Sequence, residues 1–434
     1  MPAGAETLRV HVSGALPGER VRVRVAHLSV HTAAAVREAW GELREIMAPS
    51  PERVAPICPL AGRCGACTLM SLSCAAQLAH KRDKVAVHFA EHAELKGIAV
   101  GPCLPSPRTA GYRNQAKYVY GRDHEAGKLV LGAYGRGSHR IVDLAGCRLV
   151  EPVLEEARGA LLAILVAGEV APFDEVRRTG VLRYAVMRAT GRGEVLVTLV
   201  LSRPGRADAA RVAAALGRAC PAVVGVVLNV NPSPGNVILG PEEQLLWGRA
   251  TLEDEIGDVR VRLSSRSFFQ VNREVAARIY GDVVALAPAS IERALDVYAG
   301  AAGFGLALAS RAREVLAIEE NEAATEAAAA FIAESPAAGR IRVVTGDAGR
   351  SLAAIEAADF AVLNPPRKGC VGQVLAEILR LRPQAVAYVS CDPRTLARDL
   401  AVLVRGGARV ERVVPYDMMP HTPHVETLAL LGFG

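Results

Sequence analysis

Over roughly the last 180 residues, short apolar runs alternate with amphipathic segments of helical period. We expect strands at residues 294–298, 315–319, 341–347, 359–364 and 385–390. Short runs that are apolar throughout are typical of strands buried on both faces, and such strands belong to parallel sheets. The pattern therefore predicts an α/β region of repeated strand–helix–strand units around a mostly parallel sheet.

The first part of the chain follows a two-residue period instead. Apolar and polar positions alternate on both sides of a glycine-bearing turn at residues 14–18, with valines at Val10, Val12, Val21, Val23 and Val25. This pattern predicts a β-hairpin, and basic side chains fall on its second face at Arg20, Arg22 and Arg24. We expect one apolar and one cationic face. A proline-bearing linker at residues 47–59 and a helix at about residues 74–92 follow.

The middle of the chain mixes strands at residues 112–120, 195–201 and 223–229 with a helix at about 152–166, which is typical of an α+β module. The expected division is a small β module (1–50), a cysteine-bearing segment with a helix (51–105), a central α+β domain (106–252) and the α/β domain (253–434). A length of 434 residues with 51% hydrophobic residues suits several domains.

The net charge of +6 is compatible with a phosphate-bearing partner and equally with an ordinary soluble enzyme. The start has no basic segment followed by an apolar one, and the longest apolar run, residues 160–168, is far short of the ~20 residues that a bilayer needs. We therefore expect a cytoplasmic protein. Nine cysteines, an odd number, argue against a disulfide framework and for metal binding or free thiols.

Polar residues follow four successive strands of the expected α/β sheet, at Tyr298, Glu319, Asp347 and Asn364. A glycine-bearing turn at residues 299–305 follows the first strand, and Glu319 comes about twenty residues later, where a carboxylate can accept hydrogen bonds from ribose hydroxyls. Without a G-x-G-x-x-G pattern, the site suits S-adenosylmethionine better than a dinucleotide. The alternative is a doubly wound domain with solvated loops.

Cys391 lies where the strand at residues 385–390 is expected to turn into a helix at 395–404. Open α/β sheets bind ligands at such turns, so the thiol is placed for nucleophilic chemistry. The alternative is that Cys391 is a small buried hydrophobic residue, as many free cysteines are.

Three cysteines, Cys58, Cys64 and Cys67, are spaced so that their thiolates can converge on one metal centre. A fourth ligand is needed, and the candidates are Cys74, Cys103 and Cys147. By spacing alone, a structural zinc site is a serious alternative to an iron-sulfur cluster.

Several motifs together resemble the RNA (uracil-5-)-methyltransferases, and specifically their iron-sulfur-containing 23S ribosomal RNA branch. They lie at residues 267–272 (SFFQVN), 296–298 (DVY), 365–369 (PPRKG), 388–400 (YVSCDPRTLARDL) and 419–426 (MPHTPHVE). The resemblance implies a Rossmann-like S-adenosylmethionine-dependent domain behind an RNA-binding α+β module with an iron-sulfur site. It also implies a shortened TRAM-like β-barrel for RNA contact at residues 1–50.

By that resemblance, S-adenosylmethionine is bound by Gln270, Tyr298, Glu319, Asp347 and the position of Asn364. Cys391 is the nucleophile, Glu426 is the general base, and Cys147 completes a [4Fe-4S] site. We then expect Cys74, Cys103, Cys220 and Cys370 to be packing residues. The partner is RNA, with transfer RNA as the alternative to ribosomal RNA, and a monomer is the default.

The chemistry explains these residue types. Carbon 5 of uracil is a poor nucleophile, so a thiolate, here that of Cys391, must first add to carbon 6. After methyl transfer a carboxylate, here Glu426, must remove the proton on carbon 5. The target base has to leave any helical stack, with Arg367 available for its polar edge. Basic and aromatic residues at 111–117 and 180–188 suit RNA contact, or a solvated sheet face.

The chain departs from the family pattern at Ala302, in a turn that normally reads Cys-Gly-x-Gly, at Asn364 in place of aspartate, at Phe331 in place of asparagine, and in the short first module. All of these positions bear on cofactor or RNA binding, so the hypothesis is a weakened cofactor affinity or a shifted substrate. Two alternatives remain open. An RNA-binding protein without turnover would fit the departures, and an amino-methyltransferase would fit Asn364-Pro-Pro, although Arg367 stands where those enzymes carry an aromatic ring.

Overall fold

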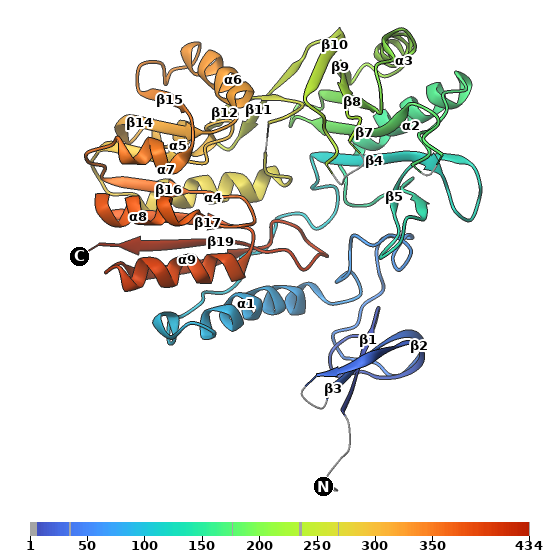
Figure 1. Cartoon of the computed structure of the whole chain (residues 1–434), viewed down its shortest axis with the longest axis horizontal. Helices are drawn as coiled ribbons and strands as arrows, with labels where there is room; N and C mark the ends of the chain where they lie inside the picture. The colour runs from blue at the N-terminus through green and yellow to red at the C-terminus, as the bar shows by residue number, and fades with distance from the viewer. Residues whose placement is uncertain (1–6, 34–35, 176, 234–236, 268, 434) are drawn as a thin grey trace, which may run out of the picture.

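The computed structural model describes residues 7–33, 36–175, 177–233, 237–267 and 269–433. Figure 1 shows a small β module near the amino terminus, a central sheet with helices on it, and a carboxyl-terminal sheet between two layers of helices. In the described part of the chain, no helix is both long enough and apolar enough to cross a membrane.

The small β module consists of β1 (Thr7–Val12), β2 (Arg20–Ala33) and β3 (Val36–Ala48) in the order β1-β3-β2. The predicted hairpin is therefore wrong, because β3 lies between the two strands, parallel to β1 and antiparallel to β2. The predicted cationic face is partly neutralised as well. Arg22 pairs with Glu45 and Arg24 with Glu42, both from the strand that the pattern missed.

Residues 49–73, all of them described, form turns and isolated bridges rather than helices or strands, as expected of a linker. The side chain of Arg53 anchors the β module to this linker, because its guanidinium pairs with Glu19, whose side chain is fully buried. The predicted helix then appears as α1 (Cys74–Ala90), followed by the short η1 (Ala93–Leu95). In Figure 1, α1 lies beside α9 of the carboxyl-terminal sheet.

The central sheet has seven strands in the order β10-β9-β8-β7-β4-β5-β6. Its strands are β4 (Gln115–Arg122), β5 (Leu129–Tyr134), β6 (Ile141–Asp143), β7 (Leu182–Ala189), β8 (Val195–Leu201), β9 (Val223–Val230) and β10 (Glu242–Gly248). Helices α2 (Pro152–Ala167) and α3 (Arg206–Ala219) pack on it, and β8 and β9 are its parallel pair. The mixture of strands and helices agrees with the predicted α+β character of this region.

A hairpin of β11 (Thr251–Ile256) and β12 (Val259–Ser264) and helix α4 (Arg273–Leu286) lead into the carboxyl-terminal sheet. Its strands are β13 (Ile291–Val297), β14 (Ala312–Glu319), β15 (Ile341–Thr345), β16 (Phe360–Leu363), β17 (Ala385–Ser390), β18 (Arg409–Tyr416) and β19 (Glu426–Gly432). Their order is β15-β14-β13-β16-β17-β19-β18. The first five are parallel, as predicted, and β19 is antiparallel to both of its neighbours.

Helices cover both faces of this sheet and enclose two apolar cores. One core includes residues of α4, α5 (Gly303–Leu308) and α6 (Glu322–Ala333). The other includes α7 (Ala348–Ala353), α8 (Gly372–Leu381) and α9 (Pro393–Arg405) together with Val85 and Phe89 of α1. Thus α1, expected in a separate segment at 51–105, contributes to the core of the carboxyl-terminal sheet. The four domain boundaries stay a prediction.

Candidate active site

Antiparallel pairing brings Cys391 and Glu426 together. The register pairs Ser390, the last residue of β17, with Thr427 of β19. One position further toward the same end of the sheet, Cys391 follows β17 and lies level with Glu426, the first residue of β19. Cys391 is half-buried and precedes α9, whose first backbone amides are capped by the side chain of Asp392. Glu426 is 4% exposed. The thiol and the carboxyl group therefore come from the ends of neighbouring strands.

Burial dominates the electrostatics of this pair. It raises the pKa of Glu426 to about 8, against the opposing charge of Arg367. Burial and then the charge of Glu426 raise the pKa of Cys391, and Arg367 again opposes the shift. A guanidinium thus lies near both groups, and a thiolate at Cys391 is easier to form when Glu426 is neutral. A carboxyl group with a pKa near 8 is also matched to proton transfer near neutral pH.

Helix α1 holds the segment that leads into Glu426. The ammonium of Lys81, whose side chain is fully buried, pairs with Asp417 and donates to the carbonyl of Met419 at 2.9 Å. Lys84 Nζ donates to the carbonyl of Pro423 at 3.0 Å. The sequence pattern alone does not distinguish these lysines, although the polar residues at 77, 81 and 84 share one face of the predicted helix.

The polar residues expected to form a cofactor site lie at one edge of the sheet. Tyr298, Glu319 and Asn364 stand at or just beyond the carboxyl ends of parallel strands whose register pairs Val297 with both Ile318 and Leu363. Asp347 follows β15, where Glu319 is paired with Thr345. The structure therefore brings these four positions to the edge where open α/β sheets bind their ligands.

Some of these side chains already serve the backbone. The carboxylate of Glu319 accepts hydrogen bonds from the amide of Gly300 at 3.0 Å and from that of Asn321 at 2.9 Å. Asp347 caps α7 by accepting from the amide of Arg350 at 3.0 Å. The hydroxyl of Tyr298 is buried and has no hydrogen-bond partner among the described residues.

Two departures from the family pattern have a clear place in the fold. Ala302 has the left-handed conformation that favours glycine, with φ 58°, and its side chain is buried in the apolar core. Phe331 lies under the guanidinium of Arg262, 5.2 Å from its ring centroid, near the carboxyl end of α6. Phe331 is thus at the end of the helix remote from Glu319. Its effect on cofactor affinity stays a prediction, as do those of Ala302 and Asn364.

The segment that carries Gln270 is attached to the central sheet. The side chain of Asn114 donates to the carbonyl of Gln270 at 3.0 Å, and its backbone amide donates to that of Val271 at 3.1 Å. Arg188, which is buried, donates to the carbonyl of Ser267 at 2.6 Å. The backbone around Gln270 is therefore held by the residue that precedes β4 and by β7 of the central sheet.

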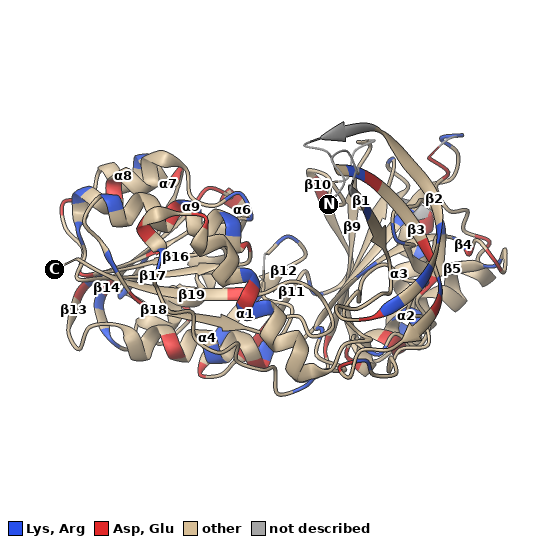
Figure 2. Cartoon of the chain, turned by 90° about the horizontal axis from the view of Figure 1, so that it is seen from below, with Lys and Arg blue, Asp and Glu red and all other residues tan. Residues whose placement is uncertain are grey.

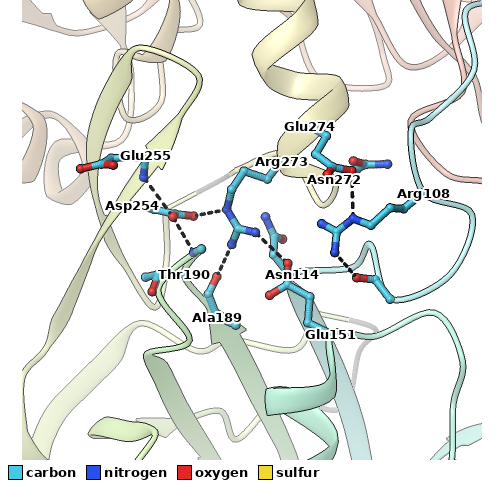
Figure 3. A network of polar contacts seen from close by, with 12 residues as sticks. Arg108, Asn114, Glu151, Ala189, Thr190, Asp254, Glu255, Asn272, Arg273 and Glu274 are labelled. Carbon is cyan, nitrogen blue, oxygen red and sulfur yellow. Dashed lines mark hydrogen bonds and ion pairs between the residues drawn. The ribbon is translucent and has the colours of Figure 1, made fainter.

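Next along the chain, Arg273 joins three segments, as Figure 3 shows. Its guanidinium contacts Asp254 of β11 at 2.9 Å, Glu151 before α2 at 2.7 Å and the carbonyl of Ala189 at 3.0 Å. All three charged side chains are largely buried. This network connects the amino end of α4 to the central sheet.

Not every basic residue proposed for RNA contact is free to make one. Arg188 is engaged as described, and burial lowers its pKa to about 10. Arg183 is 4% exposed and donates to the carbonyls of Asn231 and Ser233. In contrast, the side chains of Arg113 and Lys117 have no hydrogen bond or ion pair within the described ranges. The expectation of RNA contact is thus weakened for residues 180–188 and kept for 111–117.

Cys58, Cys64, Cys67 and Cys147 lie near one another and are all free thiols. Burial and, after it, the charges of the other three raise the pKa of Cys67 to about 12. Four thiols suit a [4Fe-4S] cluster or a structural zinc ion in kind and number. However, among the residues that the structure describes, no three His, Cys, Asp or Glu side chains are arranged to hold a metal ion.

The other cysteines were expected to be packing residues. Cys103, Cys220 and Cys370 are buried, which agrees with that prediction. Cys74 is exposed at the start of α1, so the prediction is wrong there. Two cavities of about 310 and 260 Å³ lie away from the candidate site, one against α6 and the β11–β12 hairpin and one between α2 and α3. Neither is lined by Cys391 or Glu426.

Comparison with known proteins agrees with this geometry. Residues 249–432 match the model of the tRNA (uracil-5-)-methyltransferase family. The chain is 38% identical to an uncharacterized RNA methyltransferase of Geobacter sulfurreducens, over 97% of this chain and 85% of that protein. It is 37% identical to one of Thermosynechococcus vestitus, over 97% and 92% of the two chains.

Among solved structures, the tRNA (uracil-54, C5)-methyltransferase of Pyrococcus abyssi in complex with S-adenosyl-L-homocysteine is similar with a TM-score of 0.78 and 26% identity. The likeness covers 97% of this chain and 94% of that one. The carboxyl-terminal sheet and its helices thus form an α/β methyltransferase fold. With relatives this similar over nearly its whole length, the chain belongs to the RNA methyltransferases, and its residues 249–432 match the tRNA (uracil-5-)-methyltransferase family.

Proposed function

We propose that the protein transfers the methyl group of S-adenosylmethionine to carbon 5 of a uridine in RNA. The observation that carries this proposal is the placement of Cys391 beside Glu426 at adjacent ends of β17 and β19, near Arg367. Family membership supports the reaction class, and the S-adenosyl-L-homocysteine bound to the similar Pyrococcus abyssi enzyme supports the methyl donor.

S-adenosylmethionine supplies an electrophilic methyl group, and the residues proposed to hold it are Gln270, Tyr298, Glu319, Asp347 and Asn364. The polar strand ends among them lie at one edge of the sheet, and Gln270 is presented by a segment tied to Asn114 and Arg188. Asn364 offers the shape of a carboxylate without its charge. Calorimetric titration with S-adenosylhomocysteine tests this assignment, and ordinary micromolar affinity would contradict the hypothesis of a weakened cofactor site.

In the proposed mechanism, the Cys391 thiolate adds to carbon 6 of the flipped uracil, and the electron pair moves to the ring as an enolate. Carbon 5 of the enolate then attacks the sulfonium methyl group, the bond between sulfur and that methyl group breaks, and S-adenosylhomocysteine leaves. The Glu426 carboxylate removes the remaining proton on carbon 5, after which the bond between carbon 6 and sulfur breaks and the thiolate leaves. Arg367, which lies near both groups, favours their ionised forms.

Covalent trapping tests the nucleophile. RNA that contains 5-fluorouridine has no removable proton on carbon 5, so the protein and S-adenosylmethionine should give an adduct that survives denaturation. Cys391→Ala should abolish the adduct, whereas Cys220→Ala, which changes a buried thiol of the central sheet, should keep it. Methylation by Cys391→Ala at the parental rate would overturn the assignment and favour an amino-methyltransferase. An absence of any adduct with folded protein would favour an RNA-binding protein without turnover.

We further propose 23S ribosomal RNA as the substrate, on the resemblance to the iron-sulfur-containing branch. Transfer RNA is the second candidate, because the similar Pyrococcus abyssi enzyme is a tRNA methyltransferase. The same trapping reaction with each RNA distinguishes the two, because only the true substrate should form the adduct at stoichiometric concentration. The remaining basic side chains of Arg113 and Lys117 are proposed to contact its phosphates.

We also propose that Cys58, Cys64, Cys67 and Cys147 hold a [4Fe-4S] cluster with a structural role, with zinc as the alternative. The support is the donor set and the convergence of the loop at 58–67 with the turn at 144–147. Metal analysis of anaerobically prepared protein tests this directly. Iron and a coloured preparation are expected, with iron lost in Cys58→Ser and kept in Cys74→Ser, which changes an exposed thiol. Zinc without iron would overturn the cluster assignment.

A further inference from the structure

The most exposed aromatic group of the β module is a row of three rings across its sheet. The register places His11 of β1 and His27 of β2 directly opposite Trp40 of β3, so all three side chains stand on one face. The centroids of His11 and Trp40 are 5.4 Å apart with the rings inclined by 23°, and those of His27 and Trp40 are also 5.4 Å apart. We call His11, Trp40 and His27 the aromatic row.

This row is open to solvent. Trp40 is 46% exposed, and the side chain of His11 is 50% exposed. A tryptophan is costly to leave in water, and the chain has only two. Trp40 lies between the two imidazoles, stacked on the ring of His11 and at 41° to the ring of His27, so an unpaired base can extend the stack on the side of His11.

The sheet fixes the row in place. A Cβ atom at Gly41, the neighbour of Trp40, would lie 2.2 Å from Val23 Cγ1 and 3.2 Å from Val10 Cγ1, so those valines fill the space on the opposite face. On the side of the row, Glu38 accepts from Arg9 at 3.1 Å and hydrogen-bonds to His11 Nε2 at 2.6 Å. The rings are thus held by neighbours on both faces of the sheet.

Paired charges surround the row, with three arginines against two glutamates. Arg9, Arg24 and Arg44 flank it, against the carboxylates of Glu38 and Glu42. The apolar side chains that suit a protein partner, including Val25, which is opposite Gly41 in the register, point to the other face. Figure 2 shows basic and acidic positions along the strands of this module. Stacking rings with arginines beside them are the combination with which proteins bind single-stranded RNA.

We infer that the aromatic row His11–Trp40–His27 stacks unpaired nucleobases of the substrate RNA and so positions that RNA for the proposed reaction. The inference rests on the proposed function for the identity of the substrate, but its binding test does not require methyl transfer. The row is a positioning element, because it contacts RNA and none of the reacting groups that we assign.

Tryptophan fluorescence measures the contact directly. In a Trp247→Phe background, Trp40 is the remaining tryptophan, and an unstructured oligouridylate should quench it saturably, whereas duplex RNA of the same length should not. Trp40→Ala in the full chain should raise the Kd for the oligouridylate and the KM for substrate RNA about 5- to 100-fold. Trp40→Phe should restore most of the affinity, and Val25→Ala, on the opposite face, should change neither constant.

If Trp40 only stabilised the fold, its replacement would also change kcat and the affinity for S-adenosylhomocysteine. Trp40→Ala should leave kcat and the affinity for S-adenosylhomocysteine unchanged. If the parent methylates RNA, but Trp40→Ala has the same RNA affinity and the same KM as the parent, the inference is overturned and the proposed function stands. A parent that is quenched by RNA but yields no methylated uridine would instead refute the proposed function alone. A lower sedimenting mass of Trp40→Ala with unchanged RNA affinity would make the row a contact between copies of the chain, which also overturns the inference.

Discussion

Replacing Arg273 by alanine should separate the amino end of α4 from the central sheet. In the parent, this guanidinium bridges Asp254, Glu151 and the carbonyl of Ala189 at 2.7 to 3.0 Å. Removal of one partner from a buried ion pair costs about 3–5 kcal/mol, because the remaining charge is left without compensation. The structure indicates which charge that is.

Asp254 retains two donors in the variant, since its Oδ1 accepts from the amides of Gly191 at 2.8 Å and Glu255 at 3.0 Å. Glu151 retains none, because Arg273 is the side-chain partner that the structure gives its carboxylate within the described residues. We therefore expect a loss toward the lower end of about 3–5 kcal/mol in the free energy of unfolding. Glu151→Gln added to Arg273→Ala should recover at least about 1 kcal/mol, since it removes the uncompensated charge.

The loss should depend on pH in a defined direction. Burial already raises the pKa of Glu151 above its ordinary value of 4.5, with Arg273 opposing the shift. Without Arg273 the folded pKa rises further, so the folded variant holds its proton more tightly than the unfolded chain. Its stability then falls as pH rises from about 4.5 through the folded pKa. The deficit should be smallest below pH 4.5 and largest at neutral pH.

Urea unfolding followed by circular dichroism at several pH values measures these quantities. Arg192→Ala is the matched control, because its exposed pair with Glu255 lies beside the same network and should contribute less than about 1 kcal/mol. A deficit for Arg273→Ala no larger than that of the control, or one that does not change with pH, would refute the reasoning. Since Arg273 follows the Gln270 segment, the affinity for S-adenosylhomocysteine should fall in the same variant.

Three further predictions concern the candidate site. Glu426→Gln should lower turnover about 10²- to 10⁴-fold, because the proton on carbon 5 is no longer removed. A methylated covalent adduct with ordinary uridine RNA should then accumulate and be visible on denaturing gels. In the parent, the rate of adduct breakdown should rise with pH and level off above about 8, where Glu426 is ionised. Lys81→Met should cost about 3–5 kcal/mol in urea unfolding by leaving Asp417 uncompensated, whereas Lys84→Ala, which loses a bond to a carbonyl, should cost about 1 kcal/mol. Ala302→Gly should relieve the strain of the left-handed backbone, roughly 1 kcal/mol, and this gain is offset in part by the loss of a buried methyl group. The melting temperature should therefore stay level or rise. A clear fall would show that the backbone at Ala302 is not strained.

The sequence predicted the carboxyl-terminal sheet well because its signals are local. Each parallel strand is a short apolar run that ends in a polar residue, and the shared direction of the strands places those residues at one edge. The position of β17 agrees with the expected range 385–390. Cys391 could therefore be located at a strand end before any contact was known, although its role stays a prediction.

Long-range pairing was the part that periodicity could not predict. The valine alternation identifies β1 and β2 but not the strand that lies between them, because a hairpin and an inserted third strand leave the same two-residue period. Similarly, Arg183 and Arg188 look like a basic strand face in the sequence. Their burial depends on the carbonyls of residues 231, 233 and 267, which come from other segments.

The candidate active site is consequently not a property of the carboxyl-terminal sheet alone. Glu426 follows a segment held by Lys81 and Lys84 of α1, and the backbone around Gln270 is held by Asn114 and Arg188 of the central sheet. A fragment that begins at residue 252 would retain every residue proposed to react or to bind the methyl donor, yet it would lose all of these supports. We therefore expect the segments that precede the catalytic sheet to set the geometry of its active site as well as to bind RNA.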